Sequence, residues 1–372
     1  MRPLQGIRVA DLSRVLAGPL CTMVLADLGA EVVKVERPGV GDETRSWGPP
    51  FVGDDAAYFL SVNRGKRSLE LDLKAPAGAA AARELILRSD VLVENFRPGT
   101  MARLGLDPEE LRERQPGLVV CSITAMGEDA DPRVAGYDLV MQAATGLMSL
   151  TGPVGGEPTK VGVALLDVVA GLYAAVGITA ALRERERTGR GAHVSVSLFE
   201  AGVAALVNQA ANYLLGGEVP IPMGNAHPNI APYEALSAPG GPLVLAAAND
   251  GLFVRACEVL ARPDLPSEAR FARNADRVRN REALRGLLEE ALADRPRDEW
   301  VRLLTEAGVP AAPVRDLAAV FGSEEGRATI QEIDDPERGL LRLVRSPIRL
   351  DGVAESESRP PPLLGMHEPD DL

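Results

Sequence analysis

Residues 6–38 read GIRVADLSRVLAGPLCTMVLADLGAEVVKVERP, and this stretch decides the fold. GIRVADLS alternates and is rich in β-branched residues, which predicts a strand over 7–12. PLCTMVLADLG has helical spacing and ends on Gly29, a residue type that commonly follows the last helical turn. AEVVKVERP predicts a second strand, which Pro38 ends. A strand, a helix and a further strand form a βαβ unit, and its two strands run parallel.

The alternation continues along the chain. Further strands are predicted over 68–73, 90–96 and 118–124, with helices over 77–88, 108–114 and 138–149. A long helix then runs to about 186, the strand HVSVSLFE follows, and another helix covers roughly 199–215. Strands interleaved with helices predict an α/β fold with a parallel sheet covered on both faces. We therefore expect a Rossmann-like large domain over 1–215.

The character of the chain changes after that domain. Residues 216–233 are rich in Pro and Gly, which is typical of a linker or a structured loop. A strand PLVLAAA and helices near 251–261, 280–293 and 297–307 predict a smaller α/β domain over 234–325. The remaining segment, 326–372, is expected to rejoin the large domain.

Charge and composition exclude several classes of protein. The 372 residues carry a net charge of −13, which argues against a general nucleic-acid binder. The three cysteines are odd in number and widely spaced, so we expect no disulfide framework and a cytoplasmic location. No signal segment opens the chain and no uninterrupted apolar run reaches about 18 residues, so no membrane span is expected.

Three familiar kinds of site do not fit the sequence. A βαβ start with Glu36 at the end of its second strand suggests a dinucleotide site, but the turn contains only Gly18 and lacks GxGxxG. The three histidines, His193, His227 and His367, have no spaced partners, so no metal is expected. No GxSxG elbow is present.

Asp167 stands out in the run VGVALLDVVAGLYAAVGITAALRERE, residues 161–186, because its surroundings are apolar. One account is structural: an Asp at the start of a helix caps free N–H groups and suits the helix dipole. The other account is chemical: a poorly hydrated carboxylate is a good nucleophile, and carboxylates do serve as covalent nucleophiles. Both accounts are compatible with the sequence.

The block from Ala135 to Ala201, beginning AGYDLVMQAATGLMSLTG, resembles the family III CoA-transferases and their relatives, the α-methylacyl-CoA racemases and carnitine CoA-transferases. Supporting segments keep the family's order along almost the whole chain: GIRVADLSRVLAGP, AEVVKVERPGVGDETR, NRGKRSLELDLK, DVLVENFRPGTMARLGL, GNAHPNIAPY and PPLLGMH. The resemblance implies that Asp167 is the nucleophile. It would carry CoA from an acyl-CoA to a carboxylic acid through an anhydride and an aspartyl-CoA thioester, with no metal.

The resemblance also implies which residues contact coenzyme A. Positive charge for its phosphates would come from Arg37, Lys74, Arg97 and Arg103. The further implied contacts are Leu16, Ala17, Leu71, Asp72, Leu73, Asn95, Phe96, Val134, Ala135, Gly136 and Tyr137.

The racemase relatives use a His–Asp pair and a Glu to move a proton. Their GHD motif reads Gly136-Tyr137-Asp138 here, and Asn249 is the best match for their Glu, so the resemblance favours transfer over racemisation. The glycine-rich lid of formyl- and oxalate-type transferases is missing, so oxalate and formate are not expected as substrates. GNAHP occupies that region and resembles relatives that use larger dicarboxylic acids, with Asn225 and His227 as candidate substrate contacts.

Assembly is a further implication of the resemblance. Two chains would interlock as a homodimer, with the active site near the subunit interface. The partners expected are an acyl-CoA and a small carboxylic acid. Two alternatives stay open at this point: an α-methylacyl-CoA racemase or epimerase, and a non-catalytic CoA-binding protein.

Overall fold

The computed structural model describes residues 2–131, 133–134, 136–351 and 359–367. The chain divides into two compact units. The first contains residues 1–147, 160–207 and 328–372, and the second contains 148–159 and 208–327. Residues 148–159 and 208–215 therefore group with the second unit, whereas the sequence analysis placed them in the large domain.

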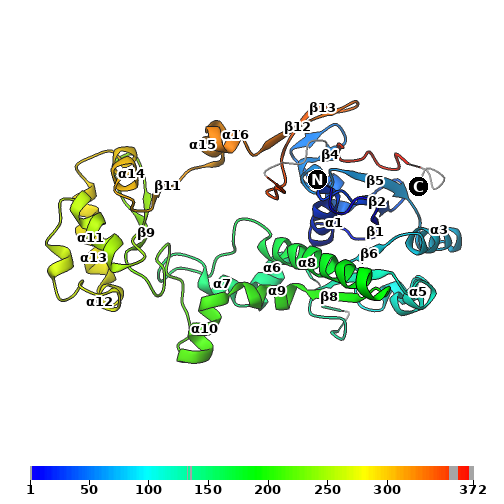
Figure 1. The fold of residues 1–372 in the computed structure, drawn as a ribbon, viewed down its shortest axis with the longest axis horizontal. Helices are drawn as coiled ribbons and strands as arrows, with labels where there is room; N and C mark the ends of the chain where they lie inside the picture. Colours follow the sequence, from blue (N-terminus) through cyan, green and yellow to red (C-terminus); the bar gives the residue numbers. More distant parts are fainter. Residues whose placement is uncertain (1, 132, 135, 352–358, 368–372) are drawn as a thin grey trace. The chain divides into compact units, whose positions relative to one another are not determined.

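The first unit is built on a six-stranded parallel sheet, which confirms the predicted α/β class (Figure 1). Its strand order is β5-β2-β1-β6-β7-β8, which is the order of a doubly wound Rossmann sheet. The direction of winding reverses between β1 and β6, because β1 pairs with both β2 and β6. The strands are β1 (Arg8–Asp11), β2 (Glu31–Glu36), β5 (Lys66–Glu70), β6 (Val91–Glu94), β7 (Val119–Thr124) and β8 (His193–Ser197).

Alternate side chains of these strands enter two separate cores. Val9 packs with α1 (Ala17–Asp27) and α8 (Leu165–Thr188) on one face of the sheet. Its neighbour Ala10 packs on the other face with α3 (Pro76–Leu87) and α5 (Pro108–Arg114). Each fully buried Val or Leu stabilises the fold by roughly 1.5–3 kcal/mol, so the apolar strands require helices on both faces.

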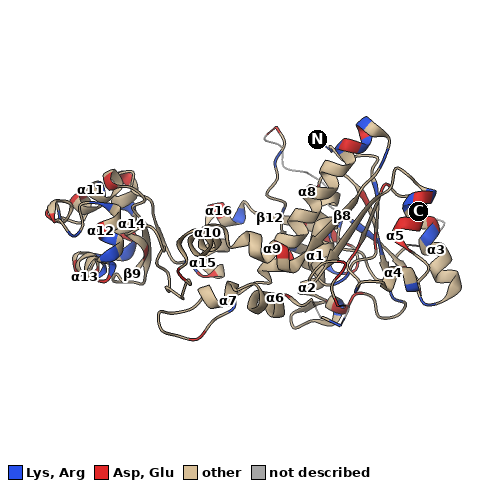
Figure 2. Ribbon diagram, turned by 90° about the horizontal axis from the view of Figure 1, so that it is seen from below, with Lys and Arg blue, Asp and Glu red and all other residues tan. Residues whose placement is uncertain are grey.

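Helix α8 is the long central helix of the first unit. By length and composition it could cross a membrane, but half of its most apolar window is buried in the fold, where it packs on α1, β7 and β8. It ends at Gly189, whose φ of 71° is a left-handed conformation that glycine adopts readily. Figure 2 shows few charged residues along most of the helix ribbon, with charged residues gathered at its C-terminal end.

Two predicted helices are interrupted by residues with positive φ. The helix expected over 138–149 divides into α6 (Asp138–Ala144) and α7 (Leu147–Leu150), on either side of Gly146 with φ 85°. The helix expected over 199–215 divides into α9 (Leu198–Ala205) and α10 (Val207–Gly216), where Val207 has φ 41°. Nothing in the local hydrophobic pattern marks either break.

Short elements complete the first unit. They are η1 (Glu43–Ser46), β3 (Phe51–Val52), β4 (Asp55–Ala56), α2 (Ala57–Ser61), α4 (Thr100–Arg103), β12 (Ile330–Asp335) and β13 (Gly339–Val344). A buried network of ion pairs joins the C-terminal segment of the first unit, 328–372, to its N-terminal part. Arg45 pairs with Glu36 and Asp55, and Asp55 also pairs with Arg338.

The second unit has its own core around a three-stranded antiparallel sheet in the order β11-β10-β9. The strands are β9 (Tyr233–Leu236), β10 (Leu243–Ala246) and β11 (Ala311–Pro313). The helices are α11 (Asp250–Val259), η2 (Leu265–Ser267), α12 (Asn274–Arg279), α13 (Arg281–Leu292), α14 (Arg297–Glu306), α15 (Leu317–Gly322) and α16 (Glu324–Arg327). The predicted strand and three helices of this region are present, while β9 and β11 were not predicted.

Candidate active site

A pocket of about 210 Å³ opens at the carboxyl ends of β1, β6 and β7, where the winding of the sheet reverses. Open α/β sheets bind ligands at this position, because the loops after adjacent strands separate there. All of its lining belongs to the first unit. The lining residues are Arg14, Val15, Leu16, Ala17, Glu43, Asn95, Phe96, Arg97, Pro98, Ile123, Thr124, Ala125, Val134, Gly136, Tyr137, Asp167 and Leu198.

Asp167 lines this pocket from the first turn of α8 and is half-buried. Asp167 lies in the first turn of α8, where its charge suits the helix dipole, but it does not cap the helix, because the N-cap residue is Ala164 and no side chain at that position caps the helix. Asp138, from the start of α6, accepts the N–H of Leu166 at 2.8 Å and that of Asp167 at 3.4 Å instead. Among the described residues, the carboxylate of Asp167 has no hydrogen-bond or ion-pair partner.

The environment of Asp167 changes its acidity. Burial, and then the nearby charge of Asp138, raise its pKa to about 7. Burial removes water from the charged form, and a like charge opposes ionisation further. A carboxylate with a raised pKa is more basic than an ordinary one and a stronger nucleophile once ionised.

An apolar cluster lies beside the carboxylate. Val15, Leu16, Tyr58 and Ala164 belong to one hydrophobic cluster, and burial followed by the charge of Asp167 raises the pKa of Tyr58 to about 12. Its phenol therefore keeps its proton. Helix α1 begins at this cluster without a side-chain cap, so its first N–H groups are directed towards the pocket end of the helix.

The loop after β6 forms a second wall of the pocket. Glu94, the last residue of β6, is buried and accepts the N–H of Phe96 at 2.8 Å. Asn95 bonds to the backbone of Arg14 across the pocket mouth. Arg14 lies over the ring of Phe96 at 5.4 Å and pairs with Glu43. The two loops of the switch point are thus joined by direct contacts.

The structure brings together some of the predicted site residues. Nine predicted residues line the pocket: Leu16, Ala17, Asn95, Phe96, Arg97, Val134, Gly136, Tyr137 and Asp167. Six predicted residues lie outside its lining, namely Arg37, Leu71, Asp72, Leu73 and Lys74, beyond the ends of β2 and β5, and Arg103 at the end of α4. Ala135 lies outside the described residues.

The candidate substrate residues Asn225 and His227 belong to the second unit, in the segment between α10 and β9. His227 accepts the N–H of Asn229 through Nδ1, and its ring packs against Tyr233 at 5.2 Å. These contacts give His227 a role in the shape of its own loop.

The residues matched to the racemase pattern have other roles. Tyr137 is 59% exposed at the pocket and precedes α6. Asn249 belongs to the second unit and caps α11 by accepting the N–H of Leu252 at 2.9 Å. Neither residue supplies the His or Glu of a proton-transfer pair.

Sequence reasoning missed several residues of the site. Arg14, Val15 and Glu43 line the pocket, Tyr58 lies near Asp167, and Asp138 caps α8. Asp138 lies 28 residues before Leu166, so no local pattern could connect the two. The contribution of the loop after β1 to the pocket follows from the strand order, which the sequence did not predict.

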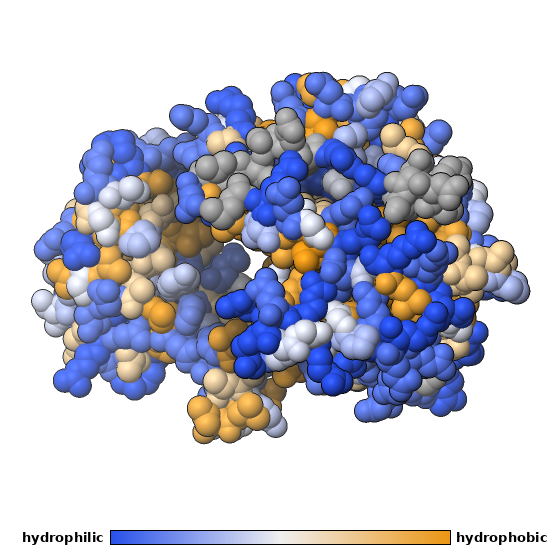
Figure 3. All heavy atoms as spheres, turned by 45° about the vertical axis from the view of Figure 1, so that its right-hand side comes forward, coloured by the Kyte–Doolittle hydropathy of each residue, from blue (hydrophilic) through white to orange (hydrophobic). Residues whose placement is uncertain are grey.

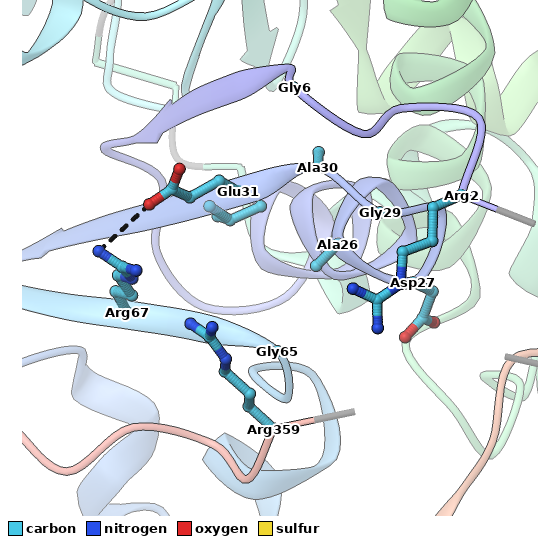
Figure 4. Close-up of a pocket in the computed structure, with 11 residues that line it drawn as sticks. Arg2, Gly6, Ala26, Asp27, Gly29, Ala30, Glu31, Gly65, Arg67 and Arg359 are labelled. Atoms are coloured by element: carbon cyan, nitrogen blue, oxygen red, sulfur yellow. Dashed lines mark ion pairs between the residues drawn. The ribbon is translucent and has the colours of Figure 1, made fainter. Parts of the chain in front are cut away.

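A larger pocket of about 420 Å³ lies at the opposite end of the strands (Figure 4). Its charged lining has both signs: Arg67 pairs with Glu31, and Asp27 is held by Arg64. It contains none of the predicted site residues and lies at the amino ends of β2 and β5. We therefore assign the chemistry to the smaller pocket. In the described part of the chain, no group of three or more His, Cys, Asp or Glu is arranged to hold a metal ion.

Comparison with known proteins decides the family. The model of the family described as "CoA-transferase family III" matches residues 4–368. The chain belongs to CoA-transferase family III. The family resemblance found in the sequence is therefore confirmed, and with it the expectation of an enzyme of this class.

Relatives with assigned reactions match over nearly the whole chain. A succinyl-CoA:glutarate CoA-transferase of Mus musculus is 41% identical over 370 residues, covering 99% of this chain and 85% of its own length. An acetyl-CoA:oxalate CoA-transferase of Acetobacter aceti is 39% identical, covering 96% and 92%. The crystal structure of a CAIB/BAIF family protein from Brucella suis aligns with TM-score 0.85 at 43% identity, covering 98% and 97%.

Proposed function

We propose that this family III CoA-transferase moves CoA from an acyl-CoA, such as succinyl-CoA, to a dicarboxylic acid through covalent intermediates on Asp167. The observation that carries the proposal is the half-buried carboxylate of Asp167, which has no partner among the described residues and lines the pocket at the switch point. Covalent catalysis by a carboxylate divides one difficult exchange into easier steps.

The exchange balances without a further reactant. The Asp167 carboxylate attacks the thioester carbonyl of the donor, the C–S bond breaks, and CoA thiolate leaves an acyl-aspartyl anhydride. The thiolate attacks the Asp167 carbonyl, which releases the donor acid and forms an aspartyl-CoA thioester. The acceptor carboxylate attacks that thioester and expels the thiolate. The thiolate then attacks the acceptor's acyl carbon, which gives the new acyl-CoA and restores the Asp167 carboxylate.

A dicarboxylic acceptor is supported by the relatives and by charge. The mouse relative is named for succinyl-CoA and glutarate, and the Acetobacter relative for oxalate. The missing glycine-rich lid argues against oxalate as an acceptor. Because the Acetobacter relative, at 39% identity, is named for oxalate, we keep oxalate among the acceptors to be tested. Arg97 lines the pocket, is exposed, and has no ion-pair partner among the described residues. It is available for a phosphate or carboxylate.

Covalent trapping tests the mechanism directly. The protein is incubated with succinyl-CoA, treated with hydroxylamine, and digested for mass spectrometry. We expect a hydroxamate on Asp167, because hydroxylamine intercepts acyl-aspartyl and aspartyl-CoA species. Asp167→Asn should abolish the label. Glu94→Gln is the matched control, because Glu94 is also a carboxyl group whose pKa burial raises to about 7, yet it is bonded to the backbone.

The outcomes separate the alternatives. No adduct on Asp167, together with uptake of solvent deuterium at the α-carbon of a 2-methylacyl-CoA, would instead establish racemisation. CoA binding with neither adduct nor exchange across a panel of succinate, glutarate, mesaconate and oxalate would establish a binding protein. Transfer activity that survives Asp167→Asn would contradict the covalent route.

We also propose an interlocked homodimer in the cytoplasm. α8 exposes Leu172, Tyr173 and Val176 on one side, and the adjacent Val203 of α9 is 40% exposed. In the second unit, α10 exposes Leu214 at 76% and Leu215 at 89%, and Figure 3 shows a group of hydrophobic atoms at the bottom of the view, where Figure 1 labels α10. Apolar patches of this kind commonly mark subunit contacts. Light scattering on a dilution series should give a mass of two chains throughout.

A further inference from the structure

Val15 has a strained backbone at the wall of the pocket. Its φ is 69°, in the left-handed region that a β-branched residue rarely adopts. Such a conformation persists only where its surroundings hold it, and it commonly occurs at functional sites. The residue shares the pocket lining with Asp167.

A buried ion pair holds both sides of this segment. Lys34 and Asp42 are 2.9 Å apart and both side chains are completely buried. Lys34 donates to the carbonyl of Ser13 at 2.8 Å, and Asp42 accepts the N–H of Val15 at 3.2 Å and 3.3 Å through its two oxygens. The pair is thus bonded to the backbone immediately before and after Arg14.

Both members of the pair are charged in the folded protein. Burial opposes the charge on Lys34, but the carboxylates of Asp42, Asp11 and Glu36 together outweigh burial and hold the pKa of Lys34 above its usual range. Burial likewise opposes the charge on Asp42, but Lys34 together with two hydrogen bonds from Thr44 outweighs burial and lowers the pKa of Asp42. A buried ion pair is by itself a weak source of stability, because desolvation offsets the attraction. The role of this pair is to bond the carbonyl of Ser13 and the N–H of Val15.

The backbone of Arg14, between Ser13 and Val15, is held by a residue of the loop after β6. Asn95 accepts the Arg14 N–H at 2.9 Å and donates to the Arg14 carbonyl at 2.7 Å. The Asn95 amide therefore bonds the backbone of the neighbouring loop with one donor and one acceptor. Every backbone polar group from the Ser13 carbonyl to the Val15 N–H has a partner outside the segment.

We propose that Lys34 and Asp42 are positioning residues, whose buried ion pair keeps Val15 in its left-handed conformation and thereby fixes the wall that Val15 shares with Asp167. The claim about catalysis rests on the proposed function. The claim about the loop does not, because it can be measured without turnover.

The first test replaces the pair by apolar residues of similar volume, Lys34→Met with Asp42→Leu. Such replacements commonly leave stability unchanged or raise it, and a thermal melt of the variant checks that it is folded before its activity is compared. We expect kcat/KM for succinyl-CoA:glutarate transfer to fall by about tenfold to one-hundredfold. This factor corresponds to the free energy released when one strained backbone residue relaxes. Amide hydrogen exchange in the peptide covering 12–17 should become faster. The proposal is overturned if kcat/KM and exchange both stay at native values.

A second buried pair supplies the matched control. Arg64 and Asp27 are also ion-paired, with 3% and 6% of their side chains exposed, and neither lines the candidate pocket. Arg64→Met with Asp27→Leu should leave kcat/KM within about twofold of native and exchange over 12–17 unchanged. An equal loss in this variant would mean that buried pairs act only through general stability, and would refute positioning.

Single variants keep the test decisive if the double variant does not fold. Asp42→Asn and Asp42→Ala both leave Lys34 without a carboxylate, but only the asparagine retains an acceptor for the Val15 N–H. We expect the asparagine variant to keep about tenfold more kcat/KM and slower exchange. Val15→Gly added to Asp42→Ala should restore part of the activity, since glycine adopts positive φ without strain. Equal behaviour of the two Asp42 variants, without rescue, would refute the proposal. If the native protein shows no transfer at all, the exchange data still decide the claim about the loop.

Discussion

Asp138 Oδ1 accepts the backbone N–H groups of both Leu166 and Asp167, so the carboxylate that caps α8 also lies close to the candidate nucleophile. The two acids differ in role because they differ in partners. Asp138 has the helix N–H groups and the amide of Gln142, whereas the Asp167 side chain has no partner among the described residues. The cap therefore positions the first turn of α8 and, by its charge, raises the pKa of Asp167.

Asp138→Asn tests this coupling. The amide oxygen still accepts the helix N–H groups, but the negative charge is gone, so the pKa of Asp167 should fall below its present value of about 7. The acidic limb of the kcat/KM profile should move to lower pH by about one unit, because the ionised nucleophile then persists to lower pH. The pH profile of succinyl-CoA turnover measures this, and an unmoved acidic limb would disprove the coupling.

Asp167→Asn should stabilise the protein while abolishing transfer. The folded pKa of Asp167 is about 7 against an ordinary value of 3.8, so the native carboxyl binds its proton more tightly than the unfolded one. Below pH 3.8 both states are protonated and the variant gains nothing. As pH rises from 3.8 to 7 the native protein progressively loses stability, and above 7 the penalty is complete, at most about 4 kcal/mol. Thermal melts at pH 4 and pH 8 should therefore show a higher Tm for the variant only at pH 8, and an equal gain at pH 4 would contradict the assignment.

The sequence predicted those features that local patterns encode. The alternation of GIRVADLS and the helical spacing that follows identify β1 and α1, and the same patterns identify β6, β7 and α8. A pattern also marked Asp167, because a charge within an apolar run is locally unusual. Patterns could not show that Asp138 would cap α8, that Val15 would adopt positive φ, or that Asn95 would bond to Arg14. These features arise from contacts between distant segments, and they depend on a strand order that periodicity does not specify.

Glu94 provides a prediction that separates charge from hydrogen bonding. Burial, with a smaller contribution from Glu128, raises its pKa to about 7, and it accepts the N–H of Phe96 at 2.8 Å. Glu94→Gln keeps an acceptor and removes the charge, so KM for the acyl-CoA should stay within about twofold of native, and Tm at pH 8 should rise. Glu94→Ala removes the acceptor and should raise that KM about tenfold, because Phe96 and Arg97 lose their fixed position.

Steady-state kinetics and melts of the two Glu94 variants measure this difference. Ser122 also hydrogen-bonds to Glu94 and lies 3.0 Å from His193, so the alanine variant removes a partner of Ser122 as well. If the glutamine variant raises KM as much as the alanine variant, the charge rather than the hydrogen bond positions the loop.

The last prediction concerns the predicted cations that lie outside the pocket. Arg37 and Lys74 are exposed beyond β2 and β5, which are paired neighbours with Glu36 opposite Glu70. The pocket of about 210 Å³ has room for the reacting end of an acyl-CoA, so we place the phosphates of CoA outside it, towards these strand ends. If the two cations bind the 3′-phosphate, Arg37→Met and Lys74→Met should each raise KM for succinyl-CoA by about fivefold to tenfold and leave KM for succinyl-dephospho-CoA unchanged. Arg83→Met is the matched control, because Arg83, on α3, donates to the carbonyl of Gly105, and its replacement should affect KM for neither substrate. Equal losses with both substrates would assign Arg37 and Lys74 to some other part of the cofactor, or to solvent.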